Sequence, residues 1–229
     1  MGNPLHFSLE LPQRCLQLID ELWPHVEKTR QADRPDLGSL STTFLISMSM
    51  PIINLPIERI ERHKSAKDEG YADDRCIDAR VATAVLEALG GQRLSKAPFY
   101  APGEWSFGTY SQRPVFNIAR SIPDDLATEL GQQEAVARAD SMPTSQWCSI
   151  VRNAMAHGGI AYLNENGRTS YGEPVKMYAF VSGVFDDADR TKLLRLNVLR
   201  ISEVNYRKFL RRWVAWLKSS GLANELSAA

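Results

Sequence analysis

The strongest constraint on the fold of this chain is a helical segment that stops abruptly at two adjacent glycines, Gly158 and Gly159. Apolar residues before the glycines follow helical spacing, at Trp147, Ile150 and Val151. Thr144 or Ser145 is suited to cap the start of this helix, and glycine readily adopts the left-handed conformation that ends one. We therefore expect a helix whose C-terminal end carries three polar residues, Arg152, Asn153 and His157.

Helical periodicity recurs along the rest of the chain. It marks residues 11–30, 39–63, 73–89, 124–139 and 202–219. Pro24 removes a backbone donor from the first of these segments, so we expect a kink or a break there. Ser41 or Thr42 is a candidate cap for the second, which Pro51 and Pro56 should make irregular.

Two short β-prone runs follow the glycine pair, at residues 160–163 and 175–181. Turn-forming residues separate them, which favours a long-looped hairpin, and residues 194–201 are a candidate third strand. Residues 92–116 instead mix proline and glycine with six aromatic residues. An aromatic loop packed on the body of the protein is the main interpretation of that stretch, and a base-stacking platform is the alternative.

Helical segments thus dominate the pattern. It predicts a mainly α-helical bundle that forms a single domain over residues 1–229. A small β-hairpin or sheet is expected as an insertion at about residues 160–201, before a C-terminal helix at about residues 202–219.

Composition bears on the class and location of the protein. Hydrophobic residues make up 44% of the chain and charged residues 24%, as in ordinary folded domains. The three cysteines are far apart and form no Cys-x-x-Cys pair, which argues against a disulfide framework and favours a reducing, cytoplasmic setting. The most apolar stretch, residues 44–55, is short and contains Pro51, so we expect a buried core helix and no membrane contact.

The polar end of the central helix carries a specific pattern. Arg152 is followed directly by Asn153, and His157 comes five residues after the arginine and just before a glycine. Composition alone would give this arrangement roughly one time in a thousand chains of this size. It resembles the Arg-x(4–6)-His signature of the HEPN superfamily, whose commonest form reads Arg-Asn-x-x-x-His. The order of the helices, the short β excursion and the Trp-rich last helix also resemble a plasmid- and bacterium-encoded HEPN subgroup.

The resemblance implies an all-helical bundle that dimerises and acts as a metal-independent endoribonuclease, with RNA as substrate, in a toxin–antitoxin or other defence system. It implies that His157 is a general base or acid, that Arg152 holds the phosphate, and that Asn153 orients the histidine or the phosphate. Residues five apart lie about 140° from one another around a helix. Because RNA cleavage also needs both an acid and a base, we expect two copies of this helix to meet in a homodimer.

Charge is segregated along the chain, although the formal net charge is zero. Residues 190–218 contain nine lysines and arginines against a single acid, Glu203. On the last helix, the basic residues away from the apolar face are candidate RNA-backbone contacts: Arg207, Lys208, Arg211 and Arg212. A solvated helix face with no ligand is an equally good interpretation.

Other motifs give weaker signals. His6, His25 and His63 have no partners at metal-ligand spacing, so we expect no metal and no cofactor. Asp186, Asp187 and Asp189 are better explained by a solvated turn than by a cation site. The chain also lacks the glycine-rich loops that bind nucleotide phosphates.

Two functions other than RNA cleavage stay open. The first is a non-catalytic HEPN-like module in which the same surface binds a nucleotide, RNA or a partner protein, such as an antitoxin or a regulator. The second is a purely structural interaction protein, in which Arg152 and His157 only cap the end of their helix.

Overall fold

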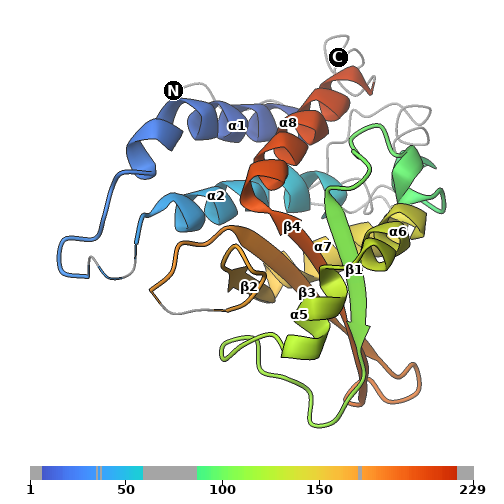
Figure 1. Ribbon diagram of the computed structural model, residues 1–229. Helices are drawn as coiled ribbons and strands as arrows, with labels where there is room; N and C mark the ends of the chain where they lie inside the picture. The colour runs from blue at the N-terminus through green and yellow to red at the C-terminus, as the bar shows by residue number, and fades with distance from the viewer. Residues whose placement is uncertain (1–6, 35, 37, 59–86, 170–171, 221–229) are drawn as a thin grey trace. The chain divides into compact units, whose positions relative to one another are not determined.

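The computed structural model describes residues 7–34, 36, 38–58, 87–169 and 172–220 (Figure 1). The chain separates into two compact units. The first is made of Met1–Gln92, Ala97–Tyr100 and Lys208–Ala229, and the second of Arg93–Lys96 and Ala101–Arg207. None of the helices within the described ranges combines the length and the apolar character needed to cross a bilayer.

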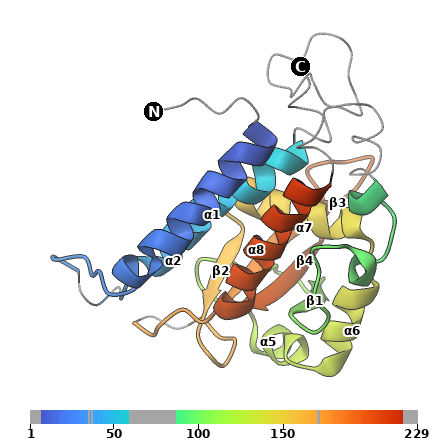
Figure 2. The ribbon, with the colours of Figure 1, turned by 90° about the horizontal axis from the view of Figure 1, so that it is seen from above.

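Helices build the first unit. Helix α1 (Phe7–Val26) packs alongside α2 (Ser41–Ser49), as Figure 2 shows. Of the kink or break predicted at Pro24, the break does not occur, because this proline falls in the last turn of α1 and only Pro24, His25 and Val26 remain in the helix from that point. A kink there stays a prediction. Helix α2 begins after Leu40, and neither Ser41 nor Thr42 caps it through its side chain.

Proline does make the second helix irregular, as predicted. After Ser49 the chain continues as a π-helical turn, η2 (Met50–Asn54), which contains Pro51. The carbonyl group of Ile52 in this turn accepts a hydrogen bond from the indole nitrogen of Trp213, at 2.8 Å. Phe99 packs edge-on against the same tryptophan, with ring centroids 4.7 Å apart. These buried contacts anchor the final part of helix α8 (Glu203–Ser219), which was predicted at about residues 202–219.

The helix predicted over residues 73–89 lies almost wholly outside the described residues, and only residues 87–89 are seen to be helical. The acidic helix predicted over residues 124–139 is two helices, α5 (Asp124–Leu130) and α6 (Gln133–Ser141). The break comes at Gly131, which has the lowest helix propensity apart from proline.

The second unit contains a four-stranded antiparallel sheet in the order β1-β4-β3-β2. Its strands are β1 (Trp105–Tyr110), β2 (Ile160–Leu163), β3 (Met177–Phe185) and β4 (Leu193–Ser202). Strands β2 to β4 match the β-prone runs, but β1 lies in the stretch predicted to be an aromatic loop. The fold is therefore mixed α/β. Helices and a sheet before the last helix were predicted, but the sheet is a substantial layer of four strands and not a small insertion in a helical bundle.

Helices cover both faces of the sheet (Figure 1). On one face α5 contributes Leu126 and Leu130 to an apolar cluster with Val181 and Val198 of the sheet. On the other face lies α7 (Thr144–Ala156). Its Trp147 meets Trp105 of β1 edge-on, with ring centroids 5.5 Å apart. The sheet is thus a central layer of this unit, and α7 is fixed against it by large buried aromatic side chains.

Candidate functional site

Helix α7 ends where the glycine pair predicted. His157 is the first residue beyond the helix, and its backbone N–H still donates to the carbonyl of Asn153 at 3.0 Å. Gly158 follows with a φ of 70°, the left-handed conformation that lets the chain leave the helix. At the other end, Pro143 occupies the cap position, so neither Thr144 nor Ser145 caps the helix.

The second glycine brings the end of α7 against strand β3. The carbonyl group of Gly159 accepts a hydrogen bond from the N–H of Val181, at 2.7 Å. A Cβ atom at position 159 would collide with the carbonyl oxygen of Val181 and lie 3.2 Å from the Cα atom of Ala154. This close approach fixes how the polar end of α7 sits over the sheet.

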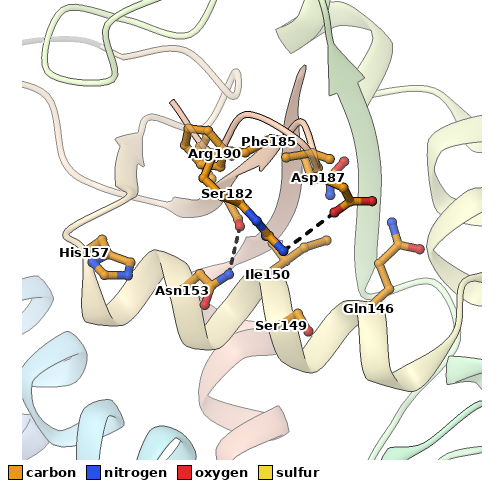
Figure 3. A pocket seen from close by; sticks show the side chains of 13 residues that line it. Gln146, Ser149, Ile150, Asn153, His157, Ser182, Phe185, Asp187 and Arg190 are labelled. Atoms are coloured by element: carbon orange, nitrogen blue, oxygen red, sulfur yellow. Dashed lines mark hydrogen bonds and ion pairs between the residues drawn. The ribbon is translucent and has the colours of Figure 1, made fainter. Parts of the chain in front are cut away.

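An open pocket of about 680 Å³ lies between α7 and the hairpin formed by β3 and β4 (Figure 3). Asn153 and His157, one turn apart on α7, both line it. The other polar or charged residues that line it are Gln146, Ser149, Ser182, Asp187, Arg190 and Asn197. The structure therefore brings two of the three predicted site residues into one pocket.

Arg152 is not among the residues that line this pocket. Its half-buried side chain places Nε and Nη2 each 3.4 Å from Oδ1 of Asn153. The amide nitrogen of Asn153 in turn donates to the hydroxyl group of Ser182 on β3, also at 3.4 Å. In one copy of the chain, Arg152 thus contacts Asn153, whose amide group lines the pocket. Arg152 and His157 lie about 140° apart around the helix, which explains why Arg152 is outside the lining.

A cation of the pocket that the sequence did not single out is Arg190, in the turn between β3 and β4. It extends over α7 towards Ile150, and it forms an ion pair with Asp187 at 3.7 Å (Figure 3). Both side chains are exposed, so this pair contributes little to stability. Arg190 follows the aspartate cluster in the sequence, but only the pairing of β3 with β4 brings it opposite α7.

The aspartate cluster forms a turn, as predicted. Oδ1 of Asp186 accepts hydrogen bonds from the backbone N–H groups of Ala188 and Asp189, at 2.9 and 3.2 Å. The side chain and the backbone N–H of Thr191 both donate to Asp189 and lower the pKa of its carboxyl group. Across the described ranges, His, Cys, Asp and Glu residues form no group of three that could hold a metal ion. Of the other histidines, His6 and His63 lie outside those ranges.

The predicted RNA-backbone residues of α8 differ in their surroundings. Arg211 forms an ion pair with Asp20 at 2.6 Å, and Nε of Arg212 donates to the carbonyl of Phe99 at 3.2 Å. Lys208 is exposed, and Arg207, which belongs to the second unit, is half-buried. Arg211 and Arg212 thus have protein partners within the first unit, and contact of any of the four residues with RNA stays a prediction.

Comparisons of the chain with protein-family models, with curated proteins and with solved structures find no match. The features of the chain that bear on function are therefore the motif and the pocket that it lines.

Proposed function

We propose that this protein is a HEPN-like, metal-independent endoribonuclease that cleaves RNA at the pocket between α7 and the β3–β4 hairpin. The observation that carries the proposal is that Asn153 and His157 of the Arg-Asn-x-x-x-His pattern line the same open pocket, together with the cation of Arg190. In keeping with the resemblance, we place the enzyme in the cytoplasm, in a toxin or defence setting with an antitoxin or another regulatory protein.

The chemistry is an internal transesterification. A base removes the proton of a ribose 2′-hydroxyl group, the 2′-oxygen attacks the adjacent phosphorus, and the bond from phosphorus to the 5′-oxygen breaks. An acid protonates the departing 5′-oxygen, which leaves a 2′,3′-cyclic phosphate and a 5′-hydroxyl end. His157 serves as base or acid, Asn153 donates to a phosphate oxygen, and Arg190 offsets the charge that grows on the phosphorus oxygens.

One chain supplies a single imidazole to this pocket, and Arg152 lies outside the lining. We infer that a second copy completes the site, because the imidazole of His157 is exposed at the end of α7 and two copies meeting there provide both an acid and a base. In this arrangement Arg152 of each copy reaches the phosphate from across the interface.

The packing of α7 differs from what the resemblance implies. This helix lies on an antiparallel sheet, whereas HEPN domains resemble all-helical bundles. The proposal therefore rests on the helix end that carries the motif and on the chemistry of that end.

The test is cleavage of single-stranded RNA in EDTA, with end-group analysis of the products. We expect wild-type protein to produce 2′,3′-cyclic phosphate ends, and His157→Ala to lower the cleavage rate by about 100-fold or more. Arg152→Ala should also lose activity. The matched control is His25→Ala, because His25 is another exposed histidine, lies on α1 and does not line the pocket. Equal cleavage by all four proteins would contradict the proposal.

The alternative is a non-catalytic module that holds RNA or a nucleotide in the same pocket. It is favoured by the lining itself, which has three amide side chains but only one imidazole. Binding of RNA that weakens steeply with salt, without cleavage at any protein concentration, would select this alternative.

A further inference from the structure

The amide group of Asn153 is held from two sides. On one side, Nε and Nη2 of Arg152 donate to its Oδ1 atom, and on the other, its Nδ2 atom donates to the hydroxyl group of Ser182 (Figure 3). A guanidinium group contains donors only, so Arg152 must face the oxygen of the amide and not its nitrogen. Each contact is long, at 3.4 Å, so the orientation of the amide depends on the two neighbours together.

This orientation gives the pocket a hydrogen-bond donor. Nδ2 of Asn153 carries two hydrogens, and within the described part of the chain the hydroxyl group of Ser182 is its partner. Asn153 lines the pocket, so the second hydrogen can be donated to a ligand there. If the amide turned over, its oxygen would take this place, and the pocket would offer an acceptor instead.

Ser182 occupies a position at which an apolar residue would be expected. It is 8% exposed and lies on β3 between Phe180 and Val184, which share its face of the strand. A buried hydroxyl group is destabilising unless it is hydrogen-bonded, whereas alanine or valine there would need no partner. The serine is therefore better explained by the amide that it holds than by the stability of the strand.

We propose that Ser182 is a positioning residue, which together with Arg152 holds the amide of Asn153 so that the pocket offers an N–H donor to a phosphate oxygen. This inference rests on the proposed function and names a further residue of the same site. A phosphodiester oxygen accepts hydrogen bonds only, so it matches the amide in this orientation and is repelled by the reversed one. A guanidinium group carries five N–H groups, so this task of Arg152 is compatible with a phosphate contact across the interface.

The test is the binding of a short single-stranded oligothymidylate DNA to the full chain in EDTA, measured by isothermal titration calorimetry. This DNA has phosphodiester bonds but no 2′-hydroxyl group, so binding is measured apart from the proposed cleavage. We expect Asn153→Ala to weaken binding about tenfold, and Ser182→Ala about threefold to fivefold, because the amide is then held from one side only. Asn153→Asp should weaken it more than Asn153→Ala does, because a carboxylate cannot donate and repels the phosphate.

Three comparisons separate positioning from a structural role. Ser182→Thr keeps the hydroxyl group and should bind within about twofold of the wild type. If Ser182 acts through the amide, the double variant Asn153→Ala with Ser182→Ala should bind as Asn153→Ala alone does. Ser106→Ala is the matched control, because Ser106 is another buried strand serine, 5% exposed, that does not line the pocket, and it should bind as the wild type does. Should threonine disturb the fold, the double variant decides the matter, because its substitutions only remove atoms.

The outcomes separate this inference from the proposed function. No binding of the DNA, binding unchanged in Ser182→Ala, or losses that simply add in the double variant would overturn the positioning role. Cleavage of RNA that depends on His157 but is unchanged in Ser182→Ala would leave the nuclease standing alone. Coupled losses of DNA binding, in a protein that cleaves no RNA, would sustain the positioning role and overturn the nuclease.

Discussion

Two neighbouring glycines end the motif helix for different physical reasons. Gly158 has a φ of 70°, and no other atom lies within 4 Å of a Cβ placed there. Its requirement is therefore one of backbone conformation. Gly159 does not have a positive φ, but a side chain at that position would collide with the backbone of β3. Glycine is required there for packing, and the close approach sets the distance between the motif and strand β3.

Substitution by alanine should separate these two requirements. Gly158→Ala should lower the free energy of unfolding by about 1–2 kcal/mol, the cost of a left-handed conformation with a Cβ atom. Gly159→Ala should lower it by about 3 kcal/mol or more, because the strand backbone must move to admit the methyl group. The measurement is urea unfolding of both variants beside the wild type. A larger loss for Gly158→Ala would show that packing at Gly159 is not tight.

At the scale of residues, the sequence predicted where the helix ends. It did not predict that Gly158 is needed for its backbone conformation and Gly159 for close packing against β3. It also identified Asn153 and His157, which do share a pocket, since residues four apart lie on one helix face. Ser182, Arg190 and Asn197 of the pocket were missed, because a strand serine, a turn arginine and a strand asparagine carry no local signal. Their role depends on the register between two strands.

Among the elements, β4 links the sheet to α5 through a half-buried arginine. Nη2 of Arg200 donates to the carbonyl of Leu130, and Nη1 to that of Ala127, at 2.5 and 3.4 Å. The last carbonyl groups of a helix have no partners within the helix and carry partial negative charge. Arg200 therefore satisfies the C-terminal end of α5 from the neighbouring strand.

Removing that cap should destabilise the protein although it removes a desolvated charge. Arg200→Met keeps much of the apolar length of the side chain but leaves the carbonyls of Leu130 and Ala127 without this donor. We expect the free energy of unfolding to fall by about 1–3 kcal/mol. Arg195→Met, on the same strand but at an exposed position, is the control and should change it by less than about 0.5 kcal/mol. Equal stability of the two variants would refute the capping role.

The sequence predicted some elements better than others. Elements with a local periodic pattern were found, whereas a strand that depends on a partner distant along the chain was not. The last helix and three strands have local periodicity, and they lie close to the predicted residues. Strand β1 does not stand out, because prolines and glycines surround it. Its partner β4 is far away along the chain, with Trp105 opposite Ile201. Pairing with β4 therefore forms this strand, and the strand completes the four-stranded sheet that makes the fold mixed α/β.

For the whole molecule, the central question is whether one chain contains a complete site. The pocket of a single copy has one imidazole and the guanidinium of Arg190, while Arg152 contacts Asn153 from outside the lining. Transesterification uses both a base and an acid in one turnover. The RNA cleavage proposed for this pocket therefore predicts a pair of chains with two His157 side chains in one cleft.

Mixing wild-type chains with His157→Ala chains tests that requirement. If a cleft needs two intact histidines, random pairing in an equal mixture leaves about one quarter of the dimers active, so the activity per total protein falls to about one quarter. If each chain acts alone, it falls only to about one half. Chains would be exchanged by dilution and reconcentration, and the dimer checked by analytical ultracentrifugation. A mixture at one half, or a wild type that stays monomeric while cleaving RNA, would exclude the composite site and return the whole reaction to the pocket of one chain.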